Sequence, residues 1–572
     1  MSVSRKIKIN HIRSFAALVI IVLLANIVSS LFYFRLDLTE DKRYTIQPAT
    51  REVLKGLDDI VVIRSYLDGE LPVAFVRMKK ALAETLNEFK VIAGKKIRFE
   101  FVNPYTVSSS KKQEQFFRQL ADKGLVPTNV HVKDKEGAMI QRIIFPGCIL
   151  TYKGKEVAVN LLRNNPNISG EENINLSIQN FEYALIDAID RVTTDTRQRI
   201  AFIQGHGEFD EFETGDIERE LSQYYEVSRV IINGDPNALK PYKTIIVAGP
   251  NRPMPEADKL IIDQFIMQGG RVLWFVDPVN VSIDSLSTGA STLAFMNQHN
   301  LDDMLFRYGA RLNPLLVQDI QCSVIPVNAA LVGQEPRFVP APWLYYPLLM
   351  PPTDNPITKG LNLIQAKFIS PIDTVGMNAE VKKRILLTTS KESKLVKVPA
   401  LINLNQVSKG ITRYEFQNPS LPVAVELQGF FKSNFRNRPI NAIIPNNSIN
   451  FIDKSIFTKM IVVADADIIR NDIQRRPNGA YVIPLGYDRF TQQTYGNKEL
   501  VVNMVKYLCD DNGLLDLRSR DIKLRLLDRK RTVSERLYWQ LVNMVLPSLI
   551  MVFAGIIWHL VRRKKYTFTH VN

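Results

Sequence analysis

Two long apolar stretches without a single charged residue lie near opposite ends of this 572-residue chain. They cover residues 14–34 and 537–561. A helix rises about 1.5 Å per residue, so each stretch is long enough to cross a hydrocarbon core of about 30 Å. We therefore expect two transmembrane helices, with one large region, 35–536, between them.

Basic residues flank both stretches on the side of the chain terminus. They are Arg5, Lys6, Lys8 and Arg13 before the first stretch, and Arg562, Arg563, Lys564 and Lys565 after the second. Cytoplasmic segments next to a span carry an excess of Lys and Arg. The basic N-terminus 1–13 and the basic tail 562–572 are therefore expected in the cytoplasm. The large region would lie on the far side of the membrane, attached to it by two passes.

Two other interpretations of these stretches are weaker. A buried core helix is rarely so long and free of charge, and Tyr538, Trp539 and Trp558 stand at the ends of the second stretch as interfacial aromatic residues do. A cleaved signal peptide has an apolar region of about 7–15 residues, and the first stretch is longer than that. A signal peptide also ends in a small-residue cleavage site, and no clear site of this kind follows the first stretch. Segment 516–536 mixes basic and acidic residues and is expected to form a juxtamembrane helix near the lipid headgroups.

The formal net charge of +15 does not indicate nucleic-acid binding. The two terminal regions, 1–34 and 537–572, contain eight basic residues and no acidic ones, so they account for about half of it. No basic stripe with interleaved aromatic residues and no zinc-finger spacing occurs. Cys148, Cys322 and Cys509 lie far apart and are expected to be small apolar thiols, although a bridge between two of them is open.

The first part of the large region, 35–165, has the pattern of a small α/β domain. Strands are expected at 59–66, 96–102, 141–151 and 156–162, with a helix at 75–89. A strand–helix–strand unit followed by a hairpin is thioredoxin-like in order. Because no Cys-x-x-Cys is present, we expect a scaffold without redox chemistry.

A second domain begins after a polar linker at 163–175. A helix with Ile178, Phe181, Leu185, Ile189 and Val192 on one face comes first. Nearly continuous apolar strands at 199–203, 244–248 and 271–276 then alternate with helices at 216–224 and 257–268, which indicates a doubly wound parallel sheet. Residues 176–300 would form its first part, 301–440 an inserted mixed α/β lobe, and 441–515 its return, with a strand at 460–467 and a helix at 498–508.

Several short motifs, in this order, resemble the GldG family, the gliding-motility-associated ABC-transporter proteins of the Bacteroidetes. They are DLTEDKRYTI at 37–46, GHGE at 205–208, GGRVLWFVDP at 269–278, NPITKGLN at 355–362, GFFKSNFRNR at 429–438, VVADAD at 462–467, YGNKEL at 495–500 and RRKKY at 562–566. The resemblance covers nearly the whole chain. The family is often called the substrate-binding component of its transporter.

With the two expected spans, this resemblance implies a bacterial inner-membrane protein with both termini in the cytoplasm and the large region in the periplasm. It also implies partners rather than an enzymatic activity. The expected partners are a membrane permease and a cytoplasmic ATPase, together with the lipid bilayer and possible envelope or peptidoglycan components. The chain itself contains no G-x-x-x-x-G-K-[ST] phosphate loop, so it is not the ATPase. Two spans are too few for a transport pathway.

Polar residues follow three of the expected parallel strands, where ligands collect in an open sheet. They are His206, Glu208, Asp277, Asp465 and Asp467. A histidine with several carboxylates could hold a cation or a polar ligand, but the spacing is no metal signature, so no metal and no cofactor are expected. The glycines and acids are better explained as a tight turn and helix caps. The order of elements is also glutamine-amidotransferase-like, yet Gly249-Pro250 and Asp277-Pro278 stand where a nucleophile would be.

These sequence features leave three functions open. The first is a non-enzymatic accessory subunit; the second is a receptor that closes its sheet edge on a small polar or glycan ligand. The third is an envelope hydrolase that pairs Glu208 with Asp277 or Asp465. A pocket at His206 favours the receptor, a carboxylate pair in an open cleft favours the hydrolase, and a filled edge favours the accessory subunit. Asn543 and Pro547 in the second span are candidate contacts with a membrane partner.

Overall fold

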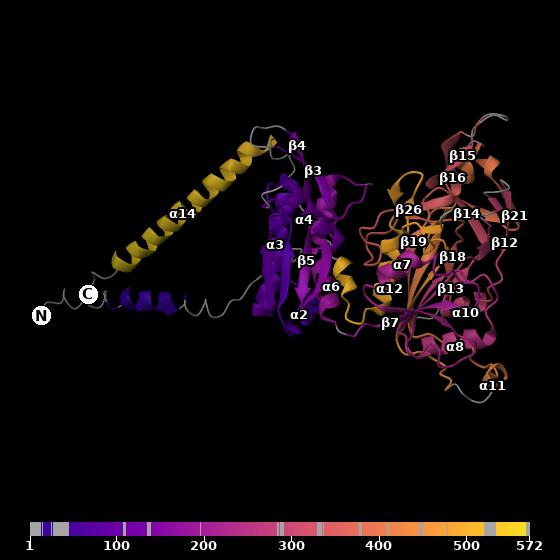
Figure 1. Ribbon diagram of the computed structural model, residues 1–572. Helices are drawn as coiled ribbons and strands as arrows, with labels where there is room; N and C mark the ends of the chain where they lie inside the picture. Colours follow the sequence, from indigo (N-terminus) through magenta and orange to yellow (C-terminus); the bar gives the residue numbers. More distant parts are fainter. Residues whose placement is uncertain are drawn as a thin grey trace. The chain divides into compact units, whose positions relative to one another are not determined.

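The computed structural model describes residues 13, 15–24 and 26, residues 45–519 with short gaps, and residues 534–567. The gaps are 107–109, 134–138, 167, 195, 283–284, 287–290, 329–334, 336, 377–379, 409–410, 445–449 and 477–478. The chain divides into two compact units, Met1–Arg520 and Asp521–Asn572. Helices and sheets alternate along the larger unit, which is a mixed α/β structure as expected (Figure 1).

A four-stranded sheet with strand order β2-β1-β5-β6 forms the first part of the larger unit. Its strands are β1 (Val61–Ser65), β2 (Ile97–Phe101), β5 (Gly147–Tyr152) and β6 (Lys155–Asn160). Helix α3 (Val73–Ala93) connects the parallel pair β1 and β2, and β5 and β6 form an antiparallel hairpin beside β1. The expected strand–helix–strand unit followed by a hairpin is therefore present.

Smaller elements surround this sheet. They are α2 (Pro48–Lys55), α4 (Ser110–Asp122), and the separate hairpin of β3 (Thr128–Lys133) and β4 (Met139–Ile144). One strand was expected over 141–151, but two occur, because Pro146 has no N–H to donate to a ladder. β4 pairs with β3 in one sheet, and β5 starts after Pro146 in another.

Two consecutive helices follow, where a linker and one helix were expected. They are α5 (Gly170–Gln179) and α6 (Phe181–Thr193). The linker 163–175 was wrong in its second half, because Ser169 caps the backbone N–H of Glu172 and the Glu172 side chain bonds back to Ser169. This reciprocal capping box starts a helix at Gly170. Phe181, Leu185, Ile189 and Val192 are buried on one face of α6, as predicted.

A seven-stranded sheet forms the core of the remaining chain. Its order is β19 (Val381–Thr388), β22 (Pro422–Gly429), β23 (Thr458–Val463), β10 (Arg271–Phe275), β9 (Thr244–Ala248), β7 (Arg199–Gln204) and β8 (Glu226–Ile231). The last five are parallel, and β22 and β19 extend the sheet antiparallel at one edge. Residues 301–440, expected as an inserted lobe, thus contribute two strands to the main sheet.

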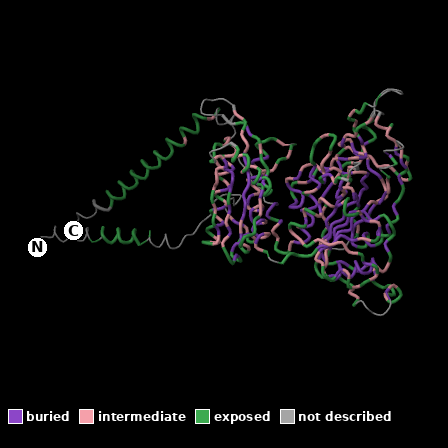
Figure 2. Tube along the Cα trace, viewed as in Figure 1, coloured by how far each residue is buried: buried purple, intermediate pink, exposed green. Residues whose placement is uncertain are grey.

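Helices cover both faces of this sheet. They are α7 (Gly215–Leu221), α8 (Glu256–Met267) and α12 (Asn497–Cys509). Along β10, Leu273 and Phe275 share one apolar cluster with α12, whereas Val272 and Trp274 share the other with α8. Alternate residues of a strand face opposite sides, so burial of both sets makes a doubly wound sheet with two apolar layers. Figure 2 shows buried residues gathered in the interior and exposed residues toward the outside.

The other elements are short and mostly paired in small sheets. The strands are β11 (Val279–Asn280), β12 (Ser291–Met296), β13 (Ala310–Leu312), β14 (Leu315–Asp319), β15 (Cys322–Asn328), β16 (Phe338–Leu349), β17 (Ile364–Gln365), β18 (Ile372–Thr374), β20 (Ser393–Lys397), β21 (Ala400–Asn403), β24 (Ile473–Arg476), β25 (Gly479–Val482), β26 (Tyr487–Asp488) and β27 (Gln493–Thr494). The helices are α10 (Asp302–Tyr308), α11 (Ile440–Ile443) and the 3-10 turns η1 (Gly94–Lys96), η2 (Leu404–Ser408), η3 (Arg413–Glu415) and η4 (Leu515–Ser519).

Among the described residues, one helix is long and apolar enough to cross a membrane. It is α14 (Arg536–Thr567), in which the segment Arg536–Lys564 qualifies as a candidate span; its most apolar 18 residues have a mean hydropathy of 2.2, and none of them is buried. Of the first expected span, the described part forms a short apolar helix, Phe15–Leu24, and the rest lies outside the described residues. Most of the expected juxtamembrane helix 516–536 also lies outside them.

All three cysteines are free thiols. Cys148 and Cys509 are buried, as expected, and Cys322 is partly exposed. Burial raises the pKa of Cys148 to about 12 and the pKa of Cys322 and Cys509 to about 11. These thiols are therefore protonated at neutral pH and are poor nucleophiles.

Candidate functional site

A small cavity of about 190 Å³ lies where several parallel strands of the main sheet end. The turns after β7 and β9, the residue Asp277 after β10 and the residue Asp467 after β23 all line it. Its charged lining residues are Glu213, Asp277, Lys367, Asp467 and Arg470. We call it the strand-end cavity. It is smaller than the roughly 300–1,000 Å³ of most ligand pockets, so only a small polar molecule would fit.

His206, the first predicted site residue, lies behind this cavity and does not line it. Its ring is buried between two carboxylates: Nδ1 is 2.8 Å from Oε1 of Glu208 and Nε2 is 2.9 Å from Oδ2 of Asp258. Glu208 also accepts the backbone N–H of His206, and Asp258 accepts that of Gly234. The ring therefore connects the turn after β7 to helix α8.

The charge of this histidine follows from its neighbours. Burial lowers the pKa of His206, but the hydrogen bonds to Asp258 and Glu208 outweigh burial and raise the pKa to about 9. At neutral pH the ring is an imidazolium whose two N–H groups both donate. It has no lone pair for a metal ion, and both of its partners are buried carboxylates. The arrangement is that of a structural ion-pair cluster.

Glycines allow the two turns at the cavity to approach each other. Gly207 has φ +77°, and a Cβ there would lie 1.9 Å from Oδ1 of Asn251. Gly249 has φ +67°, and its Cβ would lie 2.6 Å from the ring of Phe209. The backbone N–H groups of Asn251 and Arg252 both donate to the carbonyl of His206. The GHGE motif at 205–208 is thus needed for a tight turn, as the sequence favours.

Three predicted aspartates come together near the ends of β10 and β23. Asp277 accepts the backbone N–H of Ala466, and Asp465 accepts those of Lys367 and Asp467. Burial, and next the charge of Asp467, raise the pKa of Asp277 to about 7, and the same two causes raise the pKa of Asp465 well above its usual value. Asp277 and Asp467 line the cavity, whereas Asp465 is fully buried.

Two basic residues balance these carboxylates, and the sequence did not single them out. Arg470 donates to Glu213 through Nε and Nη2 at 3.0 and 2.7 Å, and it lies 3.4 Å from Asp467. Lys367 donates to Asp472 at 2.8 Å. Burial opposes the charge of Lys367, but Asp472 and Asp467 raise its pKa. Arg470 stands three residues after Asp467, so its position just past the end of β23 was a local signal in the sequence. Lys367 comes from a distant segment without a local signal.

The predicted carboxylate pair of a hydrolase is not assembled as expected. Glu208 is buried against His206 and does not line the strand-end cavity, and Asp465 is also buried. The carboxylates that do line it, Asp277, Asp467 and Glu213, are largely engaged by a backbone N–H or by Arg470. The sheet edge is therefore mostly filled, with a small polar cavity.

The predicted membrane contacts both lie in α14. Asn543 is exposed, and Pro547 stands inside the helix four residues later. A proline has no N–H, so the carbonyl of the residue four positions earlier loses its helical donor. That residue is Asn543. Its side-chain amide and its backbone carbonyl are thus both available at one position of the helix.

Comparison with known proteins gives matches over most of the chain. A profile described as "ABC-type uncharacterized transport system" matches residues 197–504, and a domain of unknown function matches residues 40–151. An uncharacterized protein of Borreliella burgdorferi is 19% identical over 549 residues, which cover 92% of this chain and 93% of the relative. A solved structure titled "mmIFT52 N-terminal domain" is similar at 12% identity and a TM-score of 0.30, over 55% of this chain and 99% of that one. The profile over 197–504 covers more than half of the sequence, and the chain belongs to the family of ABC-type uncharacterized transport systems.

Proposed function

We propose that this protein is a non-enzymatic accessory subunit that anchors in the bacterial inner membrane and associates with an ABC permease and its cytoplasmic ATPase. Family membership supports association with transporter components. The observation that carries the proposal is α14, an apolar helix of 29 residues with no buried residue in its most apolar window. A helix of that length and composition needs lipid or another apolar helix around it.

The ends of α14 support a transmembrane position. Tyr538 and Trp539 stand near its start, and Trp558 and the basic residues Arg562 and Arg563 stand near its end. Aromatic residues prefer the two membrane interfaces, and basic residues prefer the cytoplasmic side. The C-terminus is then cytoplasmic. With the first apolar stretch as a second span, the N-terminus is cytoplasmic as well and the α/β region is periplasmic.

Asn543 and Pro547 supply a specific partner contact in this proposal. Asn543 lies six residues into the expected span, about 9 Å from its outer end. At that depth an unpaired amide and an unpaired carbonyl are costly, so a hydrogen-bond donor on a neighbouring helix stabilises them. The neighbour in our proposal is a transmembrane helix of the permease. The resemblance to gliding-motility proteins extends the proposal to a transporter required for surface gliding.

The test compares two substitutions in the same helix turn. A tagged full-length chain is purified from membranes in mild detergent, and the bound permease and ATPase are quantified. Asn543→Leu should reduce both by about fivefold to tenfold, since a hydrogen bond in a membrane interface contributes about 1 kcal/mol or slightly more. Met544→Leu, at a neighbouring exposed position, should leave them unchanged. Equal recovery in both variants would contradict the contact.

A receptor for a small polar ligand is the second candidate, and the strand-end cavity favours it. Lys367, Arg470, Asp277 and Asp467 all line this volume of about 190 Å³, and charges of both signs suit a small zwitterion or a sugar fragment. Asp467→Asn should then weaken binding of such a ligand without changing recovery of the permease. Loss of permease recovery in that variant would favour the accessory function alone.

A further inference from the structure

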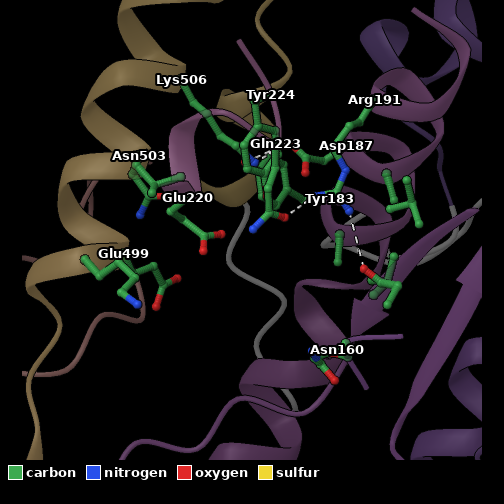
Figure 3. Close-up of a pocket in the computed structure, with 18 of the residues that line it drawn as sticks. Asn160, Tyr183, Asp187, Arg191, Glu220, Gln223, Tyr224, Glu499, Asn503 and Lys506 are labelled. Atoms are coloured by element: carbon green, nitrogen blue, oxygen red, sulfur yellow. Dashed lines mark hydrogen bonds and ion pairs between the residues drawn. The ribbon is translucent and has the colours of Figure 1, made fainter. Parts of the chain in front are cut away.

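A second and larger cavity lies within the Met1–Arg520 unit, away from the strand-end cavity. Its volume is about 1160 Å³, and all six residues of β6 line it together with parts of α6 and α12 (Figure 3). Figure 3 shows Asn160 on one side and Glu499 and Asn503 on the other. We call it the β6 cleft. It is long enough to expose a complete strand edge.

β6 is the last strand of its sheet, so one side of its backbone has no neighbouring strand. Tyr152 and Lys155 are paired across the two-residue turn of the β5–β6 hairpin and therefore bond to each other. Bonding alternates along an antiparallel pair, so Val157 and Val159 also point their backbone groups toward β5. Glu156, Ala158 and Asn160 point theirs into the cleft. Among the described residues, no protein group accepts from these three backbone N–H groups.

The cleft already contains one contact of the kind that an added strand makes. Nη2 of Arg191, on α6, donates to the carbonyl oxygen of Ala158 at 3.3 Å. This guanidinium occupies the place where a neighbouring strand would donate a backbone N–H. The contact confirms that the carbonyl of Ala158 faces the cleft. It also leaves the adjacent N–H donors open.

Ion pairs and aromatic contacts fix the floor and the far wall of the β6 cleft. Nζ of Lys506 on α12 is 2.6 Å from Oδ1 of Asp187 on α6 and 3.9 Å from the ring centre of Tyr224. The guanidinium of Arg191 lies 4.8 Å from the same ring (Figure 3). Because these side chains hold one another, the floor and the far wall are formed before any ligand enters, which lowers the entropic cost of binding. An added strand takes the place of the Arg191 guanidinium at the carbonyl of Ala158.

The charge of the lining indicates the kind of polypeptide that fits. Eight basic side chains line the cleft against four acidic ones. An extended segment with acidic residues complements this surplus. We propose that the β6 cleft binds an extended, acidic polypeptide segment of a partner protein, which adds to β6 as a fifth strand of the four-stranded sheet. This inference goes beyond the membrane contact in α14 and does not depend on it.

The test uses the full-length chain in detergent and a fluorescein-labelled peptide of alternating valine and glutamate, six residues long like β6. Fluorescence anisotropy gives its affinity. Glu156→Pro removes one N–H that faces the cleft and puts a ring carbon in its place, so the affinity should fall about tenfold or more. Glu156→Ala loses the same ion pair with Lys123 but keeps the N–H. It should bind within about twofold of the wild type.

A second comparison does not depend on how well the proline variant folds. The same peptide, N-methylated at alternate amides, keeps its side chains and loses its donors on one edge. Two such peptides exist, one for each set of alternate amides. One of the two should bind the wild-type protein at least about tenfold more weakly than the unmodified peptide. Equal binding of methylated and unmodified peptides, or no saturable binding of the unmodified one, would overturn the proposal. N-acetylglucosamine oligomers are tested in the same way. If they bind saturably and displace the peptide equally from the Glu156→Pro and Glu156→Ala variants, the cleft is a glycan site and the proposal is overturned as well.

Discussion

Replacing His206 with glutamine should destabilise the protein by an amount that depends on pH. In the folded protein the pKa of His206 is raised from 6.5 to about 9, with Asp258 and Glu208 as its partners. A raised histidine pKa gives stability that is fully present below the unfolded pKa and is lost as the pH rises through the folded pKa. Each pKa unit corresponds to about 1.4 kcal/mol, so the full contribution is about 3 kcal/mol. By the same relation about 2.5 kcal/mol remains at pH 7 and almost none at pH 10.

The assay is urea unfolding of the full-length chain in detergent, followed by tryptophan fluorescence, for the wild type and the variant at several pH values. The difference in unfolding free energy should shrink by about 2.5 kcal/mol between about pH 7 and pH 10. His299→Gln is the matched control. His299 is also buried, but burial lowers its pKa, so it is neutral over this range. A difference for His206→Gln that stays constant with pH, like that of the control, would refute the ion-pair interpretation.

Three further outcomes are expected. Gly207→Ala should cost about 1–2 kcal/mol in unfolding free energy, because φ is +77° and the Asn251 side chain must move away from the new Cβ. Gly215→Ala, with no atom within 4 Å of its Cβ, should change the unfolding free energy by less than about 1 kcal/mol. Asp277→Asn should raise the melting temperature above about pH 7, because the raised pKa of Asp277 means that its charged form destabilises the folded protein. This gain should vanish below about pH 4, where the carboxyl is protonated in the folded and in the unfolded protein. Reporter fusions before Met1 and after Asn572 should behave as cytoplasmic and an insertion near Asn280 as periplasmic; a cytoplasmic signal at Asn280 would reverse the topology.

The main sheet was predictable because its strands are buried on both faces and therefore read as continuous apolar runs. β9 and β10 were placed within one residue of their observed ends for this reason. β19 and β22 were assigned to an inserted lobe instead. β19 contains the basic run Lys382–Arg384, β22 begins at Pro422 and contains Glu426 and Gln428, and pairing at the edge of the sheet is a tertiary property. The start of α5 was missed although Ser169 and Glu172 carry a readable capping box.

The candidate site was predictable in position and only partly in chemistry. Parallel strands bring their carboxyl ends to one edge, so His206, Asp277 and Asp465 were expected near one another. The partner of His206 on α8, Asp258, is 52 residues away in sequence, and Lys367 is 98 residues from Asp465. No local pattern marks such contacts. The contacts that hold the His206 imidazolium between two carboxylates could therefore be found only from the structure.

The measurement that tests the central claim most directly is the composition of the complex that the full-length chain forms in its membrane. The tagged protein is extracted in mild detergent, and the purified material is analysed by size-exclusion chromatography and mass spectrometry. Our account predicts one peak that contains this chain, a permease and an ATPase, and that stays intact after a salt wash, because the contacts in α14 are within the membrane and are little screened. Purification of this chain alone, in a peak without permease or ATPase, would contradict the account.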